Sequence, residues 1–145
     1  MRTGFNRSDR ENMKSKYTSV IVAAPIAIIC MISAGCATEV SRTATQFSPD
    51  AGADNKYIVV TREVTVTPSA GYSRTLKAGS TWKYVGRIPE GAVYKVQDDV
   101  FMLEGKHMHE AYCVIANNEL VGFYLAVENA FSPLSSRVPL SLNQK

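Results

Sequence analysis

The sequence predicts one small domain that is mainly β, built as a barrel or a sandwich, over residues 57–134. Three observations predict this fold class. Residues 57–67 alternate between apolar and polar side chains, short apolar runs recur every 8 to 12 residues between glycine and proline turns, and no window shows a helical stripe. A segment of 78 residues is long enough for a single core.

The first predicted strand covers residues 57–67. Its apolar face carries Ile58, Val60, Val64 and Val66, and Arg62 is the single break in the period of two. Further strands are expected at apolar runs around Trp82, Val93 and Phe101. The turns between them are predicted at Ala70-Gly71, Ala78-Gly79-Ser80, Pro89-Glu90-Gly91 and Glu104-Gly105.

The clearest predicted element is a hairpin of residues 109–116 and 119–127 around Asn117-Asn118. Asparagine tolerates the positive φ that a two-residue hairpin turn requires. The predicted register pairs Ile115 with Leu120, Val114 with Val121, Cys113 with Gly122, and Tyr112 with Phe123. Both faces of these strands are apolar, which predicts central strands covered on two sides.

The first 36 residues have a different organisation. A run of 22 uncharged residues, 17–38, contains the sequence Ser33-Ala34-Gly35-Cys36. Met13 is the preferred start, because Met13-Lys14-Ser15-Lys16 is a short positive region and a 13-residue apolar segment, 20–32, follows it. This arrangement resembles the signal peptide of a bacterial lipoprotein, in which the cysteine is lipidated and becomes the first mature residue.

The resemblance implies a signal peptide over residues 1–35 and attachment to a membrane through lipid on Cys36. Cys30 fits less well, because bulky Ile28 and Ile29 precede it. Ala37 takes the place of the aspartate that marks inner-membrane retention, which favours the outer membrane facing the periplasm. The alternative is an uncleaved transmembrane helix, since about 20 apolar residues cross a bilayer core.

Composition describes the part that follows Cys36. The leader holds 5 of the 16 Lys and Arg and 2 of the 13 Asp and Glu, so 11 of each sign remain and the exported part is neutral. This balance argues against a nucleic-acid partner. Residues 36–56 predict a flexible tether, because they are polar and show no apolar period. Residues 135–145 are expected to form a C-terminal tail.

Cysteine usage excludes an intramolecular disulfide in the processed form. Cys30 leaves with the leader and Cys36 carries the lipid, so Cys113 is the one remaining thiol. It lies in the apolar sequence Tyr112-Cys113-Val114-Ile115, and a buried free cysteine behaves as a small hydrophobe. We expect Cys113 to be buried.

Aromatic residues offer one candidate ligand surface. Trp82 and Tyr84 share a strand face two residues apart, and Tyr94 follows a turn, so the three could form a shelf for a peptide or a glycan. The favoured interpretation places most of these rings in the core. The spacing of glycine and tryptophan in residues 76–82 and 85–91 also resembles the alternation of loops and strands in bacterial SH3-like barrels. This resemblance implies a fold and no function.

His107 and His109 are the weak candidates for metal ligands. Two residues apart on a strand, they would share a face at about 7 Å. A third ligand is missing, because Cys113 would lie about 13 Å beyond His109 along an extended strand. The favoured interpretation is an exposed strand end, and no metal or cofactor is predicted.

The sequence predicts no enzyme. Asp98 and Asp99 are adjacent, so on a strand they would point to opposite faces, and beside Gln97 they indicate a turn. No Gly-x-Ser-x-Gly elbow and no glycine-rich phosphate loop occurs in the chain.

Two classes of function remain. The first is an accessory module that binds a protein partner in the envelope, for example in a secretion or conjugation apparatus. The second is a periplasmic inhibitor or ligand binder that captures lysozyme or peptidoglycan fragments. Lysozyme inhibitors of this size commonly carry a disulfide, which Cys113 alone cannot form. Metal binding through His107 and His109 is a third, less favoured class.

Overall fold

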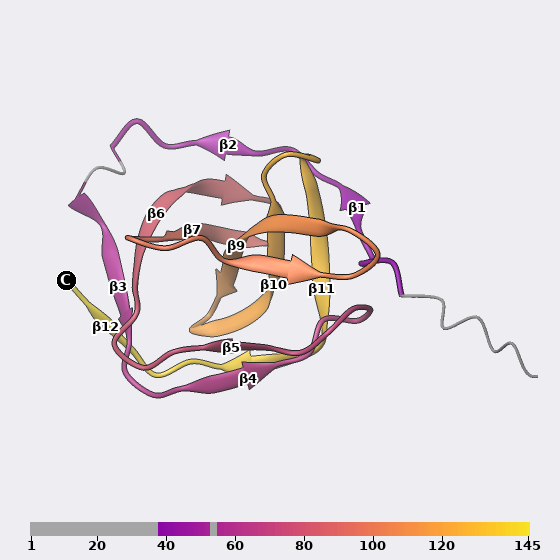
Figure 1. Cartoon of the computed structure of the whole chain (residues 1–145). Coiled ribbons are helices and arrows are strands. Elements are labelled where there is room, and N and C mark those ends of the chain that lie inside the picture. The colour runs from indigo at the N-terminus through magenta and orange to yellow at the C-terminus, as the bar shows by residue number, and fades with distance from the viewer. Residues whose placement is uncertain (1–37, 53–54) are drawn as a thin grey trace, which may run out of the picture. The chain divides into compact units, whose positions relative to one another are not determined.

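The computed structural model describes residues 38–52 and 55–145, which all fall in one compact unit (Figure 1). The predicted signal peptide, the start at Met13 and the lipidated Cys36 lie outside these residues. Within the described ranges, no helix has the length and the hydropathy that a membrane crossing requires.

The described residues form twelve strands and no α-helix. In chain order the strands are β1 Thr43–Ala44, β2 Ser48–Pro49, β3 Tyr57–Val60, β4 Val64–Val66, β5 Arg74–Leu76, β6 Thr81–Ile88, β7 Gly91–Val96, β8 Met102–Glu104, β9 Met108–Ala116, β10 Glu119–Leu125, β11 Ala130–Pro139 and β12 Leu142–Gln144. The prediction of a mainly β domain is therefore confirmed.

Ten of these strands make one antiparallel sheet, and β4 and β5 pair as a second, two-stranded sheet. The order in the large sheet is β1-β11-β10-β9-β7-β6-β3-β12, with β2 added to β6 and β8 added to β9. The large sheet is not closed into a barrel, since β1 and β12 are its two ends. In Figure 1 the sheet curves around the β4–β5 hairpin.

The main core lies on one face of the large sheet, under the β4–β5 hairpin. Val66 of β4 and Leu76 of β5 are almost fully buried and belong to the same apolar cluster as Trp82, Phe123 and Leu125. At about 25 cal/mol per Å² of buried apolar surface, such side chains supply most of the driving force for folding. The hairpin thus closes the core that the large sheet leaves open.

A second, smaller apolar cluster covers the opposite face. Ile88, Val93, Val114 and Tyr124 form it, and Phe47 from the N-terminal segment packs against it. The strands β9 and β10 are therefore covered on both faces, as their two apolar faces predicted.

The prediction of a flexible tether is wrong for residues 38–52. β1 pairs with β11, β2 pairs with β6, and Val40 is buried in the main core. The segment lies so close to β6 that only glycine fits at position 86. A Cβ atom on Gly86 would lie 2.4 Å from the carbonyl oxygen of Ser48. The segment is polar along most of its length, so its attachment depends on backbone pairing and on a few apolar side chains.

The prediction of a C-terminal tail over residues 135–145 is also wrong. β11 continues to Pro139, Leu140 is buried, and β12 pairs with β3. β12 is the last strand of the large sheet, and most of its side chains are polar, although Leu142 packs against the main core. Its main-chain hydrogen bonds, rather than an apolar pattern, hold it in the sheet.

The segment predicted as one strand over residues 57–67 is two strands. The chain leaves the ladder around Arg62, so that β3 belongs to the large sheet and β4 to the small one. Ile58, Val60 and Val66 are buried as predicted, and Val64 packs against the same core. The break in the alternation at Arg62 therefore marks a change of sheet.

The hairpin around Asn117-Asn118 forms, and both asparagines have positive φ, 54° and 63°. The pair Ile115–Leu120 is correct, but the three further predicted pairs are shifted by one residue. A bulge at Val121 pairs Gly122 with Val114 and Phe123 with Cys113. The extra residue turns both Leu120 and Phe123 toward the main core, where they are fully buried.

Candidate functional site

The proposed aromatic shelf is not formed. Trp82 is 2% exposed, its ring meets Phe101 edge-on at 5.6 Å, and its Nε1 donates a hydrogen bond to Ser80 Oγ at 3.0 Å. Tyr84 is also buried, with its ring centroid 5.5 Å from that of Tyr94. These rings belong to the domain interior, because alternate residues of β6 and β7 face the main core.

Tyr94 alone of the three reaches an open hollow. The hollow has a volume of about 240 Å³ and is lined by Asn55, Lys56, Tyr57, Ile58, Tyr94, Gln144 and Lys145. Burial, with a smaller contribution from Tyr84, raises the pKa of the Tyr94 hydroxyl. Tyr94 is therefore a neutral hydrogen-bonding group at the rim of this hollow over the physiological pH range.

The two histidines do not share a face. His107 is exposed in the turn between β8 and β9, whereas His109 is 4% exposed on β9. His109 Nδ1 pairs with Glu128 Oε1, and the other polar atom of each side chain, His109 Nε2 and Glu128 Oε2, is buried without a hydrogen-bond partner. The described residues contain no group of three side chains able to hold a metal ion.

Cys113 is fully buried in the main core, as predicted. Burial raises the pKa of its thiol well above the ordinary value of 9.0. The thiolate is the nucleophilic form of cysteine, and both burial and the raised pKa disfavour it in the folded domain.

Asp98 and Asp99 lie in the bend after β7, as their sequence indicated. Asp98 has a φ of 60°, and Asp99 Oδ1 accepts a hydrogen bond from the Val100 amide at 2.7 Å. The bend borders an open hollow of about 480 Å³ that is also lined by Lys83 and Lys95. Both aspartates therefore have local roles in the bend, Asp98 through its positive φ and Asp99 through its bond to the next amide.

Lys95 anchors a polar network beside that hollow. Its Nζ lies 3.3 Å from Glu110 Oε1 and 5.2 Å from the centre of the Tyr112 ring. The interaction with Tyr112, followed by that with Glu110, raises the pKa of the Lys95 ammonium. The network places an ion pair, the Lys95 ammonium and the Glu110 carboxylate, beside the rim.

A different surface gathers exposed apolar side chains at the end of the domain where the described chain begins. We call it the N-terminal edge and define it by Tyr72, Lys106, Met108 and Val127. Tyr72 is 56% exposed, Met108 57% and Val127 77%, and only one other large apolar side chain among the described residues, Val100, is exposed to this degree. Lys106 is exposed at the tip of the β8–β9 turn.

Hydrogen bonds and strand register bring the turns of this edge together. The Tyr72 amide donates to the carbonyl of Glu104 at 3.2 Å, and Glu104 is paired with Met108 across β8 and β9. Val127 lies in the β10–β11 turn, where the Ala126 amide donates to the carbonyl of Glu110 at 3.4 Å.

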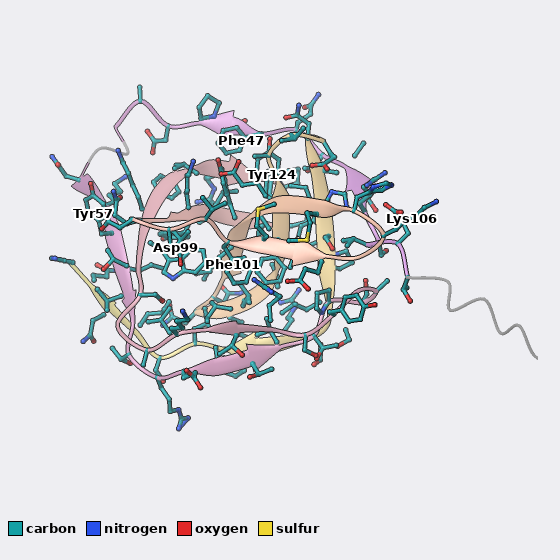
Figure 2. The ribbon with its side chains drawn as sticks, in the orientation of Figure 1. Phe47, Tyr57, Asp99, Phe101, Lys106 and Tyr124 are labelled. Atoms are coloured by element: carbon teal, nitrogen blue, oxygen red, sulfur yellow. The ribbon has the colours of Figure 1, made fainter. Side chains whose placement is uncertain are left out.

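The N-terminal segment passes directly beside these turns. A Cβ atom on Gly105 would lie 2.8 Å from Val40 Cγ2 and 2.9 Å from the carbonyl oxygen of Thr38. Figure 2 shows Lys106 next to the start of the described chain, with Asp99 far across the view. Val100, the neighbour of Asp99, is thus remote from this edge.

Most charges near the edge are paired. Arg74 binds Glu104 at 2.7 Å, and Arg42 binds Glu39 at 3.2 Å. These pairs leave the edge close to neutral, with Lys106 at its tip. Sequence reasoning missed the edge because Tyr72 and Val127 stand singly in loops and Met108 is the first residue of β9, so no periodic apolar pattern marks them.

No protein-family model, no curated protein and no solved structure matches the chain.

Proposed function

We propose that the chain is a lipoprotein of the bacterial cell envelope, held on a membrane by lipid on Cys36 and facing the periplasm from the outer membrane. The observation that carries this proposal is the order of a short positive region, an apolar segment and small residues before a cysteine in residues 13–36.

The β-domain then acts as a binding or structural module rather than as an enzyme. Its thiol is buried, its buried histidine is paired with Glu128, and its adjacent aspartates shape a turn. The partner we favour is another envelope protein, as in a secretion or conjugation apparatus. The similarity of residues 76–82 and 85–91 to SH3-like barrels stays a prediction about the fold and implies no function.

The second candidate is a binder of a soluble ligand such as a peptidoglycan fragment. The hollow of about 480 Å³ beside Lys95 and Asp98 supports it, because it offers both charges and an apolar floor of Val85 and Val96. The hollow is open and shallow, which is less suited to small ligands than an enclosed cavity.

Intact mass and membrane fractionation test the anchor. Wild-type protein expressed in a bacterium should yield a mature species that begins at Cys36, carries added acyl mass and sediments with membranes. Cys36→Ser should abolish the acyl mass, and Cys30→Ser, the matched control, should leave processing intact. An unprocessed chain that stays in the membrane despite Cys36→Ser would overturn the lipoprotein proposal in favour of a retained helix.

Affinity purification from the same membranes separates the two roles. A module of an assembly should co-purify with stoichiometric envelope proteins from detergent extracts. A ligand binder should instead be recovered alone and show saturable binding of muropeptides in calorimetry.

A further inference from the structure

We infer that the N-terminal edge lies against the phospholipid surface to which the chain is anchored, so that the domain is held in one orientation instead of swinging on a tether. This inference rests on the proposed function, because it requires attachment at or near Cys36. It deepens that proposal by stating which surface meets the lipid and which is left for a partner.

The stretch of chain between Cys36 and the folded domain is short. Val40 is 1% exposed, so the chain is already fixed to the domain four residues after Cys36. Four residues span at most about 14 Å even when fully extended. The N-terminal edge therefore cannot move far from the membrane.

The N-terminal edge is rich in exposed apolar side chains. Tyr72, Met108 and Val127 are three of the four large apolar side chains that the described residues expose. Gly71, next to Tyr72, and Gly105, in the turn before Met108, both lie against Val40. Val127 follows Ala126, whose amide donates to the carbonyl of Glu110 on β9. Exposed apolar side chains gathered in one place indicate an interaction surface. A tyrosine with an apolar ring and a polar tip suits the interface between lipid and water.

The charged side chains near the edge are also compatible with an anionic lipid surface. Arg42 and Arg74 near the edge pair with Glu39 and Glu104, and Glu128, the neighbour of Val127, contacts His109, so each of these carboxylates has a basic partner. Lys106 adds a positive charge at the tip of the β8–β9 turn, which attracts the anionic headgroups of a bacterial phospholipid surface. A neutral edge with one lysine fits lipid better than it fits a strongly charged protein.

The orientation has a consequence for the remainder of the domain. The hollow lined by Lys95, Asp98 and Val100 would face away from the lipid, where a periplasmic partner can reach it. The domain would therefore present a fixed surface to the periplasm.

A fluorescent probe that reports lipid contact tests the orientation. Mature lipidated protein with Met108→Cys, Tyr72→Cys or Val100→Cys is labelled with an environment-sensitive dye and floated with phosphatidylethanolamine and phosphatidylglycerol vesicles. Labelling is selective because Cys113 is buried and the Cys36 sulfur carries lipid. With quencher-bearing lipids, emission from positions 72 and 108 should fall roughly twofold, as expected for groups within about 5–10 Å of the acyl boundary. Position 100 should not change.

The outcomes separate the two proposals. Protein that does not float with the vesicles would overturn the anchor and the orientation together. Protein that floats but shows equal emission at positions 72, 108 and 100 would overturn the orientation alone. A blue shift at position 108 without quenching by lipid would also overturn it, since that result means that protein covers the edge.

A second variant removes the attraction without touching the anchor. Adding Met108→Asp to protein labelled at position 72 should restore most of the emission, because a carboxylate is repelled by the lipid surface. Val100→Asp, the matched control, should restore none of it. Unchanged quenching in the Met108→Asp variant would contradict a role for the edge.

Discussion

The ring of Phe47 stacks on the ring of Tyr124, with centroids 5.0 Å apart and an interplanar angle of 17° (Figure 2). Phe47 belongs to a segment whose polar composition is typical of a linker, and Tyr124 to a central strand. The contact shows how the N-terminal segment is held: its backbone pairs at β1 and β2, and this ring covers the second face of the sheet between them.

Phe47→Ala should therefore destabilise the domain. The half-buried ring contributes both burial and stacking, so we expect a loss of about 2 kcal/mol. Urea unfolding of detergent-solubilised protein measures it as a lower midpoint. Gln46→Ala, at an exposed neighbouring position, should change stability by less than about 0.5 kcal/mol. Equal effects of the two changes would show that the ring does not hold the segment.

Gly86→Ala should displace the N-terminal segment. The new Cβ would lie 2.4 Å from the Ser48 carbonyl oxygen and 2.9 Å from Phe47 Cζ, distances that require the backbone to move. We expect a loss of more than about 2 kcal/mol and faster proteolysis between residues 38 and 52. Gly79→Ala separates this steric effect from backbone strain, because Gly79 has a φ of 82° but open space around its Cβ position. It should cost about 1 kcal/mol and leave proteolysis of residues 38–52 unchanged.

Glu128→Ala should leave the His109 ring buried without any partner. The Nε2 atom of His109 has no hydrogen-bond partner in the wild type, and Nδ1 would lose the Glu128 carboxylate that it contacts. An unsatisfied buried polar group costs about 1–3 kcal/mol, so the midpoint of urea unfolding should fall clearly. The control is His107→Ala in the exposed turn, for which we expect no measurable change. A result in which both variants unfold like the wild type would contradict the structural role of the pair.

The burial of Cys113 predicts how stability depends on alkaline pH. Its pKa is raised well above 9.0 in the folded state, so above pH 9.0 the unfolded thiol releases a proton that the folded thiol retains. The stabilisation is complete below pH 9.0 and declines as the pH rises, by up to about 1.4 kcal/mol per pH unit. Unfolding curves of the wild type and Cys113→Ala between pH 8 and 10 should diverge in slope, with the variant less sensitive. Parallel slopes would mean that the folded thiol titrates normally.

Local patterns predicted the elements of this domain well where the determinant is short-range. The positive φ of Asn117 and Asn118 and the turn at Asp98 follow from the residue types themselves. The burial of Ile58 and Val60 follows from a period of two, and that of Cys113 from its apolar neighbours. Each of these depends on interactions within a few residues.

The candidate sites were predicted less well, because exposure depends on which face of a sheet is covered. Trp82 and Tyr84 lie two residues apart on β6 and both are buried, Trp82 in the main core and Tyr84 against Tyr94. His107 and His109 do not share a face because β9 begins at Met108. His107 therefore lies in the β8–β9 turn, outside the alternation of side chains along the strand.

The mainly β class, the turns and most of the core can be predicted from the chain alone, because hydrophobic alternation and the conformational preferences of asparagine and glycine act locally. Tertiary structure decided the register beyond Leu120, the docking of residues 38–52 and the strand β12. The bulge at Val121 exists because Phe123 is buried in the main core while Gly122, on the other face, lies against the backbone of Ser132. The edge strands are held by backbone hydrogen bonds, which every sequence can form and which therefore leave no signature in the side chains.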